Sequence, residues 1–269
     1  DKNNVTYEAG AQVGSQMTKS PFNYFKQNST GNYVAFGFYP QTIKSNDVTI
    51  EDFTNFNGVA YYLGSDGYLY EKVKESAFRS TYKFSNGTGI KQSSENKYQY
   101  FKLEPIIWQI MNPTETGSKL LYSVAELQAS KFHDSSIVYK TSTIRNFLLN
   151  TFMPKAFTSE QQGLSSWENG SIEDKASAVE DSGDKIFLAS KSDLENTSYF
   201  SDKSARIKWS TDYAGATGAH RVSTASEGGY YWLRSYQLYN MVLGVASSGY
   251  FGNEYPYTTS GGFAPALFL

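Results

Sequence analysis

The order of the apolar segments along the chain constrains its fold more than any other feature. Residues 33–40, 98–111 and 229–235 are rich in aromatic and β-branched side chains, which favour strands. Segments with helical spacing lie between the second and the third of these runs. Strands towards both ends with helices in the middle indicate an α+β domain rather than alternating βαβ units.

The sequence predicts a tight hairpin around Asp66-Gly67. Two β-rich runs, residues 58–63 and 68–70, flank this dipeptide, which readily takes the positive φ angles of a tight turn. Pro105 marks an expected break in the strand region that contains it, because proline cannot donate to a strand ladder. The apolar ending, residues 262–269, predicts a central strand of the sheet.

Two helices are predicted from local patterns. Residues 144–152 carry apolar side chains at helical spacing, and Pro154 is expected to end that helix. Thr158 predicts the start of a second, short helix. Residues 165–183 are polar and predict an exposed loop, which precedes a strand over residues 184–190.

One α+β domain is expected over residues 32–269, because no change in composition demands two domains. Residues 1–31 are predicted to be a polar leader, and residues 45–98 a hairpin-containing insertion. The chain begins at Asp1 without an initiator methionine or an apolar signal core, which suggests a start after a removed export signal. We therefore expect a bacterial protein that is extracellular or attached to the cell surface.

Charge and cysteine content exclude several partners and chemistries. With 24 basic and 26 acidic residues the net charge is −2, so no basic excess exists to neutralise a nucleic-acid backbone. No apolar stretch approaches the roughly 18 residues of a membrane span. The absence of cysteine excludes disulfides, thiolate catalysis and Cys-ligated metal centres. No cofactor is expected.

Aromatic residues make up 16% of the chain, including 22 tyrosines. Tyrosine combines an apolar ring with a polar tip, which suits half-exposed strand faces and also ligand-binding surfaces. Abundant β-structure is the simpler explanation of this composition. A surface that contacts carbohydrate or protein is the alternative.

The order of several short motifs resembles a bacterial domain family of unknown function. Its members read F-G-x-Y-P-Q, E-P-I-x-W, S-x-I-R-x-W-L-N, D-x-x-F-L-L-S, W-L-R-S-P and G-V-R-P-A-L. The resemblance runs from about residue 33 to the end of the chain. The corresponding segments are residues 36–41, 104–108, 142–150, 184–190, 231–235 and 262–267.

This family is similar to the C-type-lectin-like fold of formylglycine-generating enzymes and of variable ligand-binding proteins. The resemblance implies a mixed, twisted antiparallel sheet with two or more helices and long loops that form a binding surface. Ala264 replaces the Arg of the last motif, and Tyr236 replaces the Pro after W-L-R-S, so no role of that Arg carries over. The copper chemistry of the formylglycine-generating enzymes needs cysteine and is excluded.

Few residues are candidates for catalysis. The two histidines, His133 and His220, lie in no spaced metal-ligand motif, so each is expected to be a surface or packing residue. A carboxylate pair for glycoside hydrolysis depends on separation in space rather than in sequence. Glu104, Asp184 and Asp212 lie near predicted strand ends and stay open candidates for such a pair.

No metal site is predicted, although four acidic residues lie close together in the sequence. They lack the alternating ligand pattern of a calcium loop. Glu104-Pro105 is followed by isoleucine, so the sugar-binding motif of calcium-dependent lectins is missing as well. The four residues are Asp181, Asp184, Asp193 and Glu195.

Arg145 and Arg234 lie in apolar settings on predicted regular elements. An arginine is costly to bury unpaired, so each should meet a carboxylate or several carbonyls, and Asp184 is the expected partner of one of them. We expect these arginines, together with Trp108 and Trp232, to be structural residues of the motifs.

The loops after Ser235 are the best candidate ligand surface. They combine tyrosine and asparagine with glycine and serine, which gives rigid aromatic contacts beside adaptable hydrogen bonds. The same residues would also serve to cover the edge of the core. The candidates are Tyr236, Tyr239, Asn240, Asn253, Tyr255 and Tyr257.

Three functions remain open at this point, and the sequence favours binding over catalysis. The first is a non-catalytic extracellular binding or adhesion module that recognises a glycan or a protein surface through the Tyr-rich loops. The second is a glycan-acting hydrolase with a carboxylate pair. The third is a structural cell-surface domain. A cleft with two carboxylates would favour the second, and a large apolar patch without concavity the third.

Overall fold

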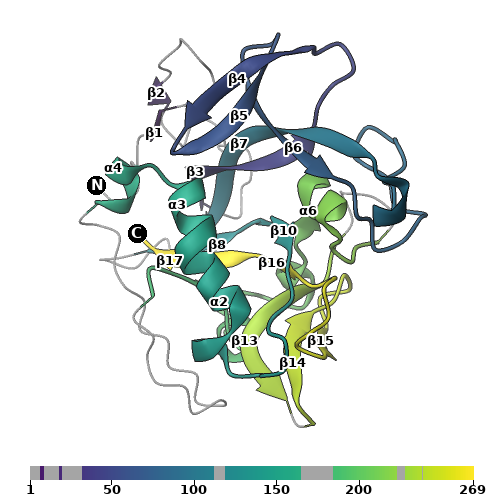
Figure 1. The fold of residues 1–269 in the computed structure, drawn as a ribbon. Helices are drawn as coiled ribbons and strands as arrows, with labels where there is room; N and C mark the ends of the chain where they lie inside the picture. Colours follow the sequence, from purple (N-terminus) through teal and green to yellow (C-terminus); the bar gives the residue numbers. More distant parts are fainter. Residues whose placement is uncertain are drawn as a thin grey trace.

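The computed structural model describes residues 7–8, 18–19, 32–111, 119–164, 184–222, 228–237 and 239–269. Most of the predicted leader and all of the predicted loop over residues 165–183 lie outside this part of the chain. The described residues form helices and several antiparallel sheets, which confirms the mixed helix-and-sheet architecture (Figure 1). No helix within these ranges is long and apolar enough to cross a membrane.

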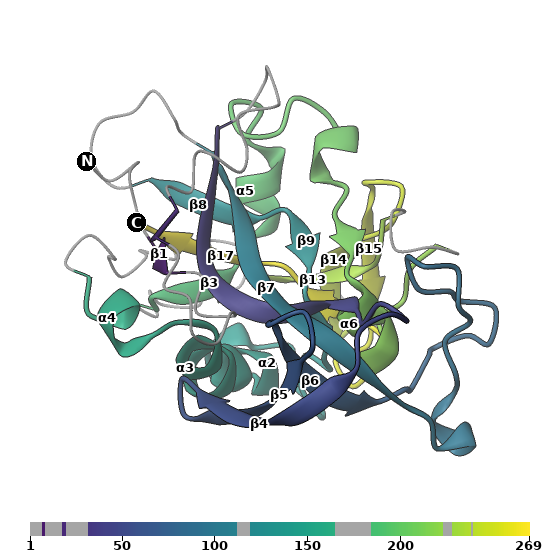
Figure 2. The ribbon, with the colours of Figure 1, turned by 90° about the horizontal axis from the view of Figure 1, so that it is seen from above.

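The larger sheet is organised around its longest strand, β7 (Tyr98–Ile110). This strand pairs antiparallel with three others, and Figure 2 shows it running beside β3 (Asn32–Ile43). The apolar ending forms β17, which lies between β11 and β8 as the sequence predicted. Along the sheet the order is β11 (Ile186–Leu188), β17 (Pro265–Phe268), β8 (Leu120–Ser123), β7, β6 (Leu69–Lys74), β5 (Val59–Gly64) and β4 (Ile50–Phe56).

The first two motifs fold as one unit in β3 and β7. Phe36 and Gly37 of β3 lie opposite the single residue Ile106 of β7, which makes a bulge. Gly37 has a φ of 75°, a conformation that favours glycine. The indole N–H of Trp108 donates to the carbonyl of Phe36 at 2.7 Å. The expected break at Pro105 is wrong, because β7 continues through this residue. The missing N–H of Pro105 is tolerated there because the bulge next to it already interrupts the hydrogen bonds between the two strands.

The smaller sheet is joined to the larger one at the end of the chain. Only Ala264 separates β16 from β17, so the chain passes directly from one sheet to the other. Trp232 is fully buried, and its indole N–H donates to the carbonyl of Ser130 at 2.7 Å. The order is β10 (Gln128–Ala129), β16 (Gly262–Phe263), β13 (Tyr231–Gln237), β14 (Met241–Val245) and β15 (Phe251–Glu254).

The main helix is longer than the sequence predicted. It comprises α2 (Thr143–Phe147), the π-helical turn η3 (Leu148–Phe152) and α3 (Met153–Ala156). Pro154 does not end it, because the π turn precedes α3 and places the proline in the first turn of that segment, where its missing N–H is tolerated. Phe152 packs edge-on against Phe263 at 5.4 Å, which ties the helix to the smaller sheet.

The remaining elements are short. Thr158 caps α4 (Ser159–Gln162) by accepting a hydrogen bond from the Gln161 amide at 3.2 Å, as predicted. The others are β1 (Tyr7–Glu8), β2 (Thr18–Lys19), η1 (Ser93–Glu95), β9 (Ala125–Glu126), η2 (Tyr139–Thr141), α5 (Lys191–Glu195), η4 (Ser204–Arg206), β12 (Trp209–Ser210) and α6 (Asp212–Thr217).

Among the elements that were not predicted, β4 and α6 have clear signals in the sequence. Asn57-Gly58 joins β4 to β5, and both residues have positive φ, as a tight hairpin turn requires. Thr211 caps α6 by accepting from the Ala214 amide at 3.0 Å, and Gly218 ends it in the left-handed region.

Two arginine–carboxylate contacts connect the elements of the C-terminal half. Arg145 of the main helix makes a two-pronged contact with Asp184, with N–O distances of 2.6 and 2.7 Å. Arg234 of β13 donates to the Leu188 carbonyl at 2.6 Å and meets Asp193 of α5 at 2.9 Å. Because Asp184 is almost completely buried, its charge depends on the guanidinium for compensation.

Replacing Arg145 with methionine is expected to lower the free energy of unfolding by about 3 kcal/mol, because it leaves Asp184 buried without a cation. The value is at the low end for a buried pair since part of the arginine reaches solvent. Lys91→Met, which breaks an exposed pair with Glu95, is the control and should leave the free energy of unfolding unchanged within measurement error. Urea unfolding of both variants tests this, and equal stabilities would contradict it.

Two ionisable side chains, Glu126 of β9 and Lys208 directly before β12, are buried. Glu126 lies against the backbones of Gly229 and Gly262, where any added Cβ would collide with its carboxylate. Burial raises the pKa of Glu126 well above its usual range. Lys208 is 3% exposed, with its Nζ 3.9 Å from the centroid of the Tyr122 ring, and burial lowers the pKa of Lys208 to about 7.

Replacing Lys208 with methionine is expected to remove a pH dependence of stability. The unfolded chain holds a proton on this amine up to about pH 10, whereas the folded protein releases it near pH 7. The parent protein should therefore gain stability as the pH rises through this window, relative to Lys208→Met. Urea unfolding at several pH values measures the difference between the two proteins. A difference that is constant with pH would contradict the expectation.

Candidate functional site

A groove in the smaller sheet brings together residues from four elements. Its volume is about 520 Å³. Leu243 and Phe251 provide apolar surface from β14 and β15, while Lys191 and Glu195 come from α5. The groove is therefore built by segments that are about fifty residues apart in the chain. Its other lining residues are Ser235, Tyr236, Gln237, Gly252 and Asn253.

Two cations lie beside the Phe251 ring, Lys191 from the groove lining and Arg206 from outside it. The guanidinium of Arg206 lies 4.6 Å from the ring centroid and the Lys191 ammonium 5.7 Å from it. Lys191 and Glu195 form an exposed ion pair at 3.3 Å. Asn253 donates to the side-chain oxygen of Gln237 at 2.9 Å, and both amides keep further donor and acceptor capacity.

The groove is anchored to the body of the protein by α5. The amide of Lys191 donates to the hydroxyl of Ser235 at 2.9 Å, and Ser190 caps the helix by accepting from the Asp193 amide at 3.0 Å. Arg234 holds the same helix through Asp193. Consequently the two walls of the groove are fixed relative to each other by hydrogen bonds and one ion pair.

Only two of the six predicted ligand residues, Tyr236 and Asn253, line this groove. Tyr239 and Asn240 form the β13–β14 turn with positive φ angles, and Tyr239 is 86% exposed. In the loop after β15, two tyrosine rings stack almost parallel at 5.3 Å. These are Tyr255 and Tyr257.

The outer edge of β15 offers backbone groups as well. β15 is the last strand of its sheet and pairs with β14. The amide of Ala246 donates to the Tyr250 carbonyl at 2.9 Å, so by alternation the backbone groups of Phe251 and Asn253 point away from β14. The groove thus has an edge that can pair with an extended chain.

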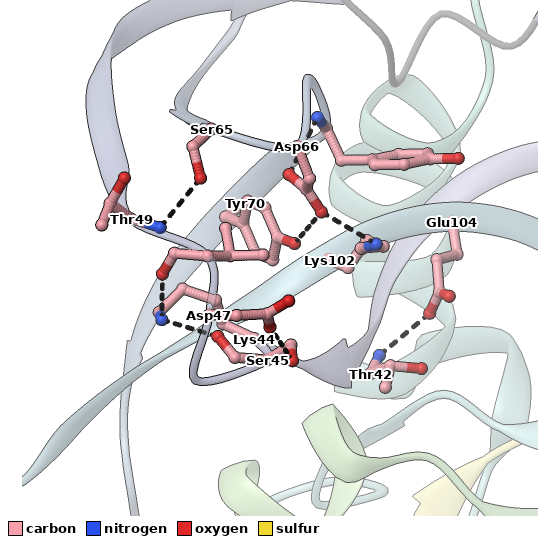
Figure 3. Close-up of polar contacts among 12 residues, drawn as sticks. Thr42, Lys44, Ser45, Asp47, Thr49, Ser65, Asp66, Tyr70, Lys102 and Glu104 are labelled. Atoms are coloured by element: carbon pink, nitrogen blue, oxygen red, sulfur yellow. Dashed lines mark hydrogen bonds and ion pairs between the residues drawn. The ribbon is translucent and has the colours of Figure 1, made fainter.

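A second, smaller cavity of about 250 Å³ lies beside the N-terminal end of α6. Asp212 lines it, but its carboxylate already accepts from the Ile43 amide and from the amide and hydroxyl of Ser85. Glu104 accepts from the Thr42 amide at 3.0 Å (Figure 3). Burial raises the pKa of Glu104, and the charge of Asp212 adds to the rise.

The other residues that the sequence offered for catalysis or metal binding make structural contacts with their neighbours. Asp184 pairs with Arg145, and the Nδ1 atom of His133 accepts from the Ser135 and Ser136 amides. His220 packs against aromatic rings, and burial lowers its pKa. In the described ranges, no three His, Asp or Glu side chains are grouped to hold a metal ion, and Asp181 lies outside those ranges.

Sequence reasoning missed the residues that α5 contributes to the groove. Lys191 and Glu195 are four residues apart on one helix face, which is a local signal, but nothing in the sequence places that face opposite Tyr236. Phe251 was not among the candidate residues either, because the sequence does not show which aromatic side chains are exposed.

Comparison with known proteins gives one match. Residues 116–269 match a family described as a domain of unknown function, DUF6273. No curated protein and no solved structure matches the chain. The motifs at residues 36–41 and 104–108 lie outside the matched region, and the relation to C-type lectins stays a prediction. The matched region includes every residue of the groove and more than half of the chain. The chain therefore belongs to the DUF6273 family.

Proposed function

We propose that this chain is a non-catalytic recognition module that binds a glycan in the groove between α5 and strands β13–β15. The observation behind the proposal is the convergence of an aromatic ring, two side-chain amides and an exposed ion pair on one concavity of about 520 Å³. Sugars present apolar ring faces and many hydroxyl groups, and this combination offers partners for both.

The polarity of the groove supports a hydrophilic ligand. Gln237, Asn253 and Glu195 are exposed, so their hydrogen-bonding groups are accessible to a ligand without prior rearrangement. Leu243 and Phe251 add apolar surface beside these polar groups. A few placed polar groups beside apolar surface are typical of sites that fix the orientation of a small ligand.

A protein ligand is the second candidate, and the free edge of β15 favours it. An extended peptide could pair with the outward backbone groups of Phe251 and Asn253 and place alternate side chains in the groove. An exported, bacterial cell-surface location, which we also propose, suits both ligands. A glycan needs no conformational ordering of a partner chain, and we therefore place it first.

The hydrolase alternative has weaker support. Asp212 is saturated by three donors, which leaves it little capacity to act as a base or nucleophile, and Glu104 does not line the same cavity. A large flat apolar patch would favour a purely structural cell-surface domain, whereas this groove is concave and carries polar side chains beside its apolar ones.

Glycan-array binding of the purified chain tests the proposal with two double variants. Tyr236→Ala/Asn253→Ala removes one aromatic and one amide contact from the groove and should weaken binding about tenfold or more, since each contact is worth about 1 kcal/mol. Tyr239→Ala/Tyr257→Ala removes exposed rings outside the groove and should bind like the parent.

Thermal unfolding of both variants controls for folding. Binding that is lost only in Tyr239→Ala/Tyr257→Ala would move the site to the loop tips and contradict the groove. Absence of binding to any glycan would leave the peptide as the remaining candidate, to be tested by pairing of extended peptides with β15.

A further inference from the structure

A second surface, separate from the groove, lies on the outer side of strands β4 to β7. In an antiparallel sheet, directly opposite residues and alternate residues of one strand share a face. Phe53 lies opposite Tyr62, and Tyr62 lies opposite Tyr70. Two residues further along β6, Lys72 lies opposite Tyr100, and Lys74 lies opposite Tyr98. We call this set the aromatic–lysine face: Phe53, Tyr62, Lys72, Lys74, Tyr98 and Tyr100.

The rings of the aromatic–lysine face are not core residues. Phe53 is 62% and Tyr98 46% exposed, while Tyr61, Leu69 and Phe101 on the opposite side of the same strands are buried. The opposite side therefore packs against the protein, and the aromatic–lysine face is turned towards solvent. Exposing two large rings is unfavourable unless they serve cross-strand packing or a ligand.

The rings form a continuous row across the strands. The centroids of Phe53 and Tyr62 are 4.2 Å apart, and those of Tyr62 and Tyr100 are 5.2 Å apart. The outer centroids of this row, those of Phe53 and Tyr100, are therefore at most 9.4 Å apart. The Tyr62 and Tyr100 planes are at 86°, so the row follows a twisted rather than flat platform.

Cations accompany the rings. The ammonium of Lys72 lies 5.4 Å from the Tyr98 centroid and 5.7 Å from that of Tyr100. Within the described part of the chain, neither Lys72 nor Lys74 forms an ion pair. At the covered end of the face, Lys102 is paired with Asp66 at 3.1 Å, and Asp66 also accepts from Tyr70 (Figure 3).

We propose that the aromatic–lysine face binds an anionic glycan, with its sugar rings on the row of aromatic side chains and its acidic groups at Lys72 and Lys74. The unpaired cations supply charge complementarity that the groove, with its internal Lys191–Glu195 pair, does not. A sparsely charged glycan fits better than a single-stranded nucleic acid, because the protein as a whole carries a net charge of −2 and would repel a continuous polyanion.

The proposal does not depend on the groove. Strands β4 to β7 lie outside the DUF6273 match, and Figures 1 and 2 both show β4 and β5 well separated from β14 and β15. The two surfaces can therefore be inactivated separately, and the failure of one does not imply the failure of the other.

The test is retention of the full chain on immobilised sulfated, uronate and sialylated glycans, each beside its neutral counterpart, at low and high salt. Lys72→Gln/Lys74→Gln is expected to weaken binding to the anionic members about tenfold, and high salt should weaken the parent in the same way. Phe53→Ala/Tyr98→Ala should abolish retention, because the stacking surface is lost.

Lys83→Gln/Lys203→Gln is the matched control, since it removes the same charge from exposed positions outside both surfaces and should retain anionic glycans like the parent. Thermal unfolding verifies that each variant is folded, and the two lysine variants keep the aromatic packing intact. The proposal is overturned if anionic glycans are retained no better than neutral ones, or if both lysine variants lose binding equally. Lys72-dependent binding of oligo(dT) that exceeds binding of every glycan would overturn it in favour of nucleic acid.

Discussion

The pairing of β7 with three partner strands is the constraint on which the rest of the fold depends. β3, β6 and β8 all hydrogen-bond to this one strand, and its Trp108 is fully buried with its indole N–H satisfied by β3. The DUF6273 match begins at residue 116, so it includes β8 but not β7. Without β7, the matched region would leave an edge of β8 unpaired, which is unfavourable for a buried strand. The matched and unmatched parts of the chain therefore share one sheet.

A second constraint connects this sheet to the groove. The smaller sheet meets the larger one at Ala264, and Arg234 of β13 contacts both the Leu188 carbonyl of β11 and Asp193 of α5. The residues that follow Arg234 in β13 line the groove. Packing of the two sheets thus sets the position of the candidate binding residues, although none of the connecting residues lines the groove. The W-L-R-S segment is accordingly buried, and β13 leads from it directly into the groove.

Sequence patterns predicted the fold where the signal is local. Asp66-Gly67 and Thr158 act through contacts within a few residues. The predicted hairpin forms, although only Gly67 of the pair has a positive φ, and Thr158 caps its helix as predicted. Patterns failed where an irregular backbone conformation, a bulge or a π turn, changes a local preference. Pro105 is accommodated because Gly37 bulges the neighbouring strand, and Pro154 because a π turn precedes it. Neither compensation is visible near the proline in the sequence.

The same division holds for the candidate surfaces. Tyr236 and Asn253 were named as candidates for their residue types, but both lie in strands, β13 and β15, rather than in the expected loops. Lys191 joins them only through tertiary packing. The aromatic–lysine face shows the limit more clearly. Tyr61 and Tyr62 are adjacent in the sequence and are the same residue type. Tyr61 is buried, whereas Tyr62 faces outwards, because successive strand residues point to opposite sides of the sheet. An aromatic content of 16% fits both roles, and only the strand register separates rings that build the core from rings available to a ligand.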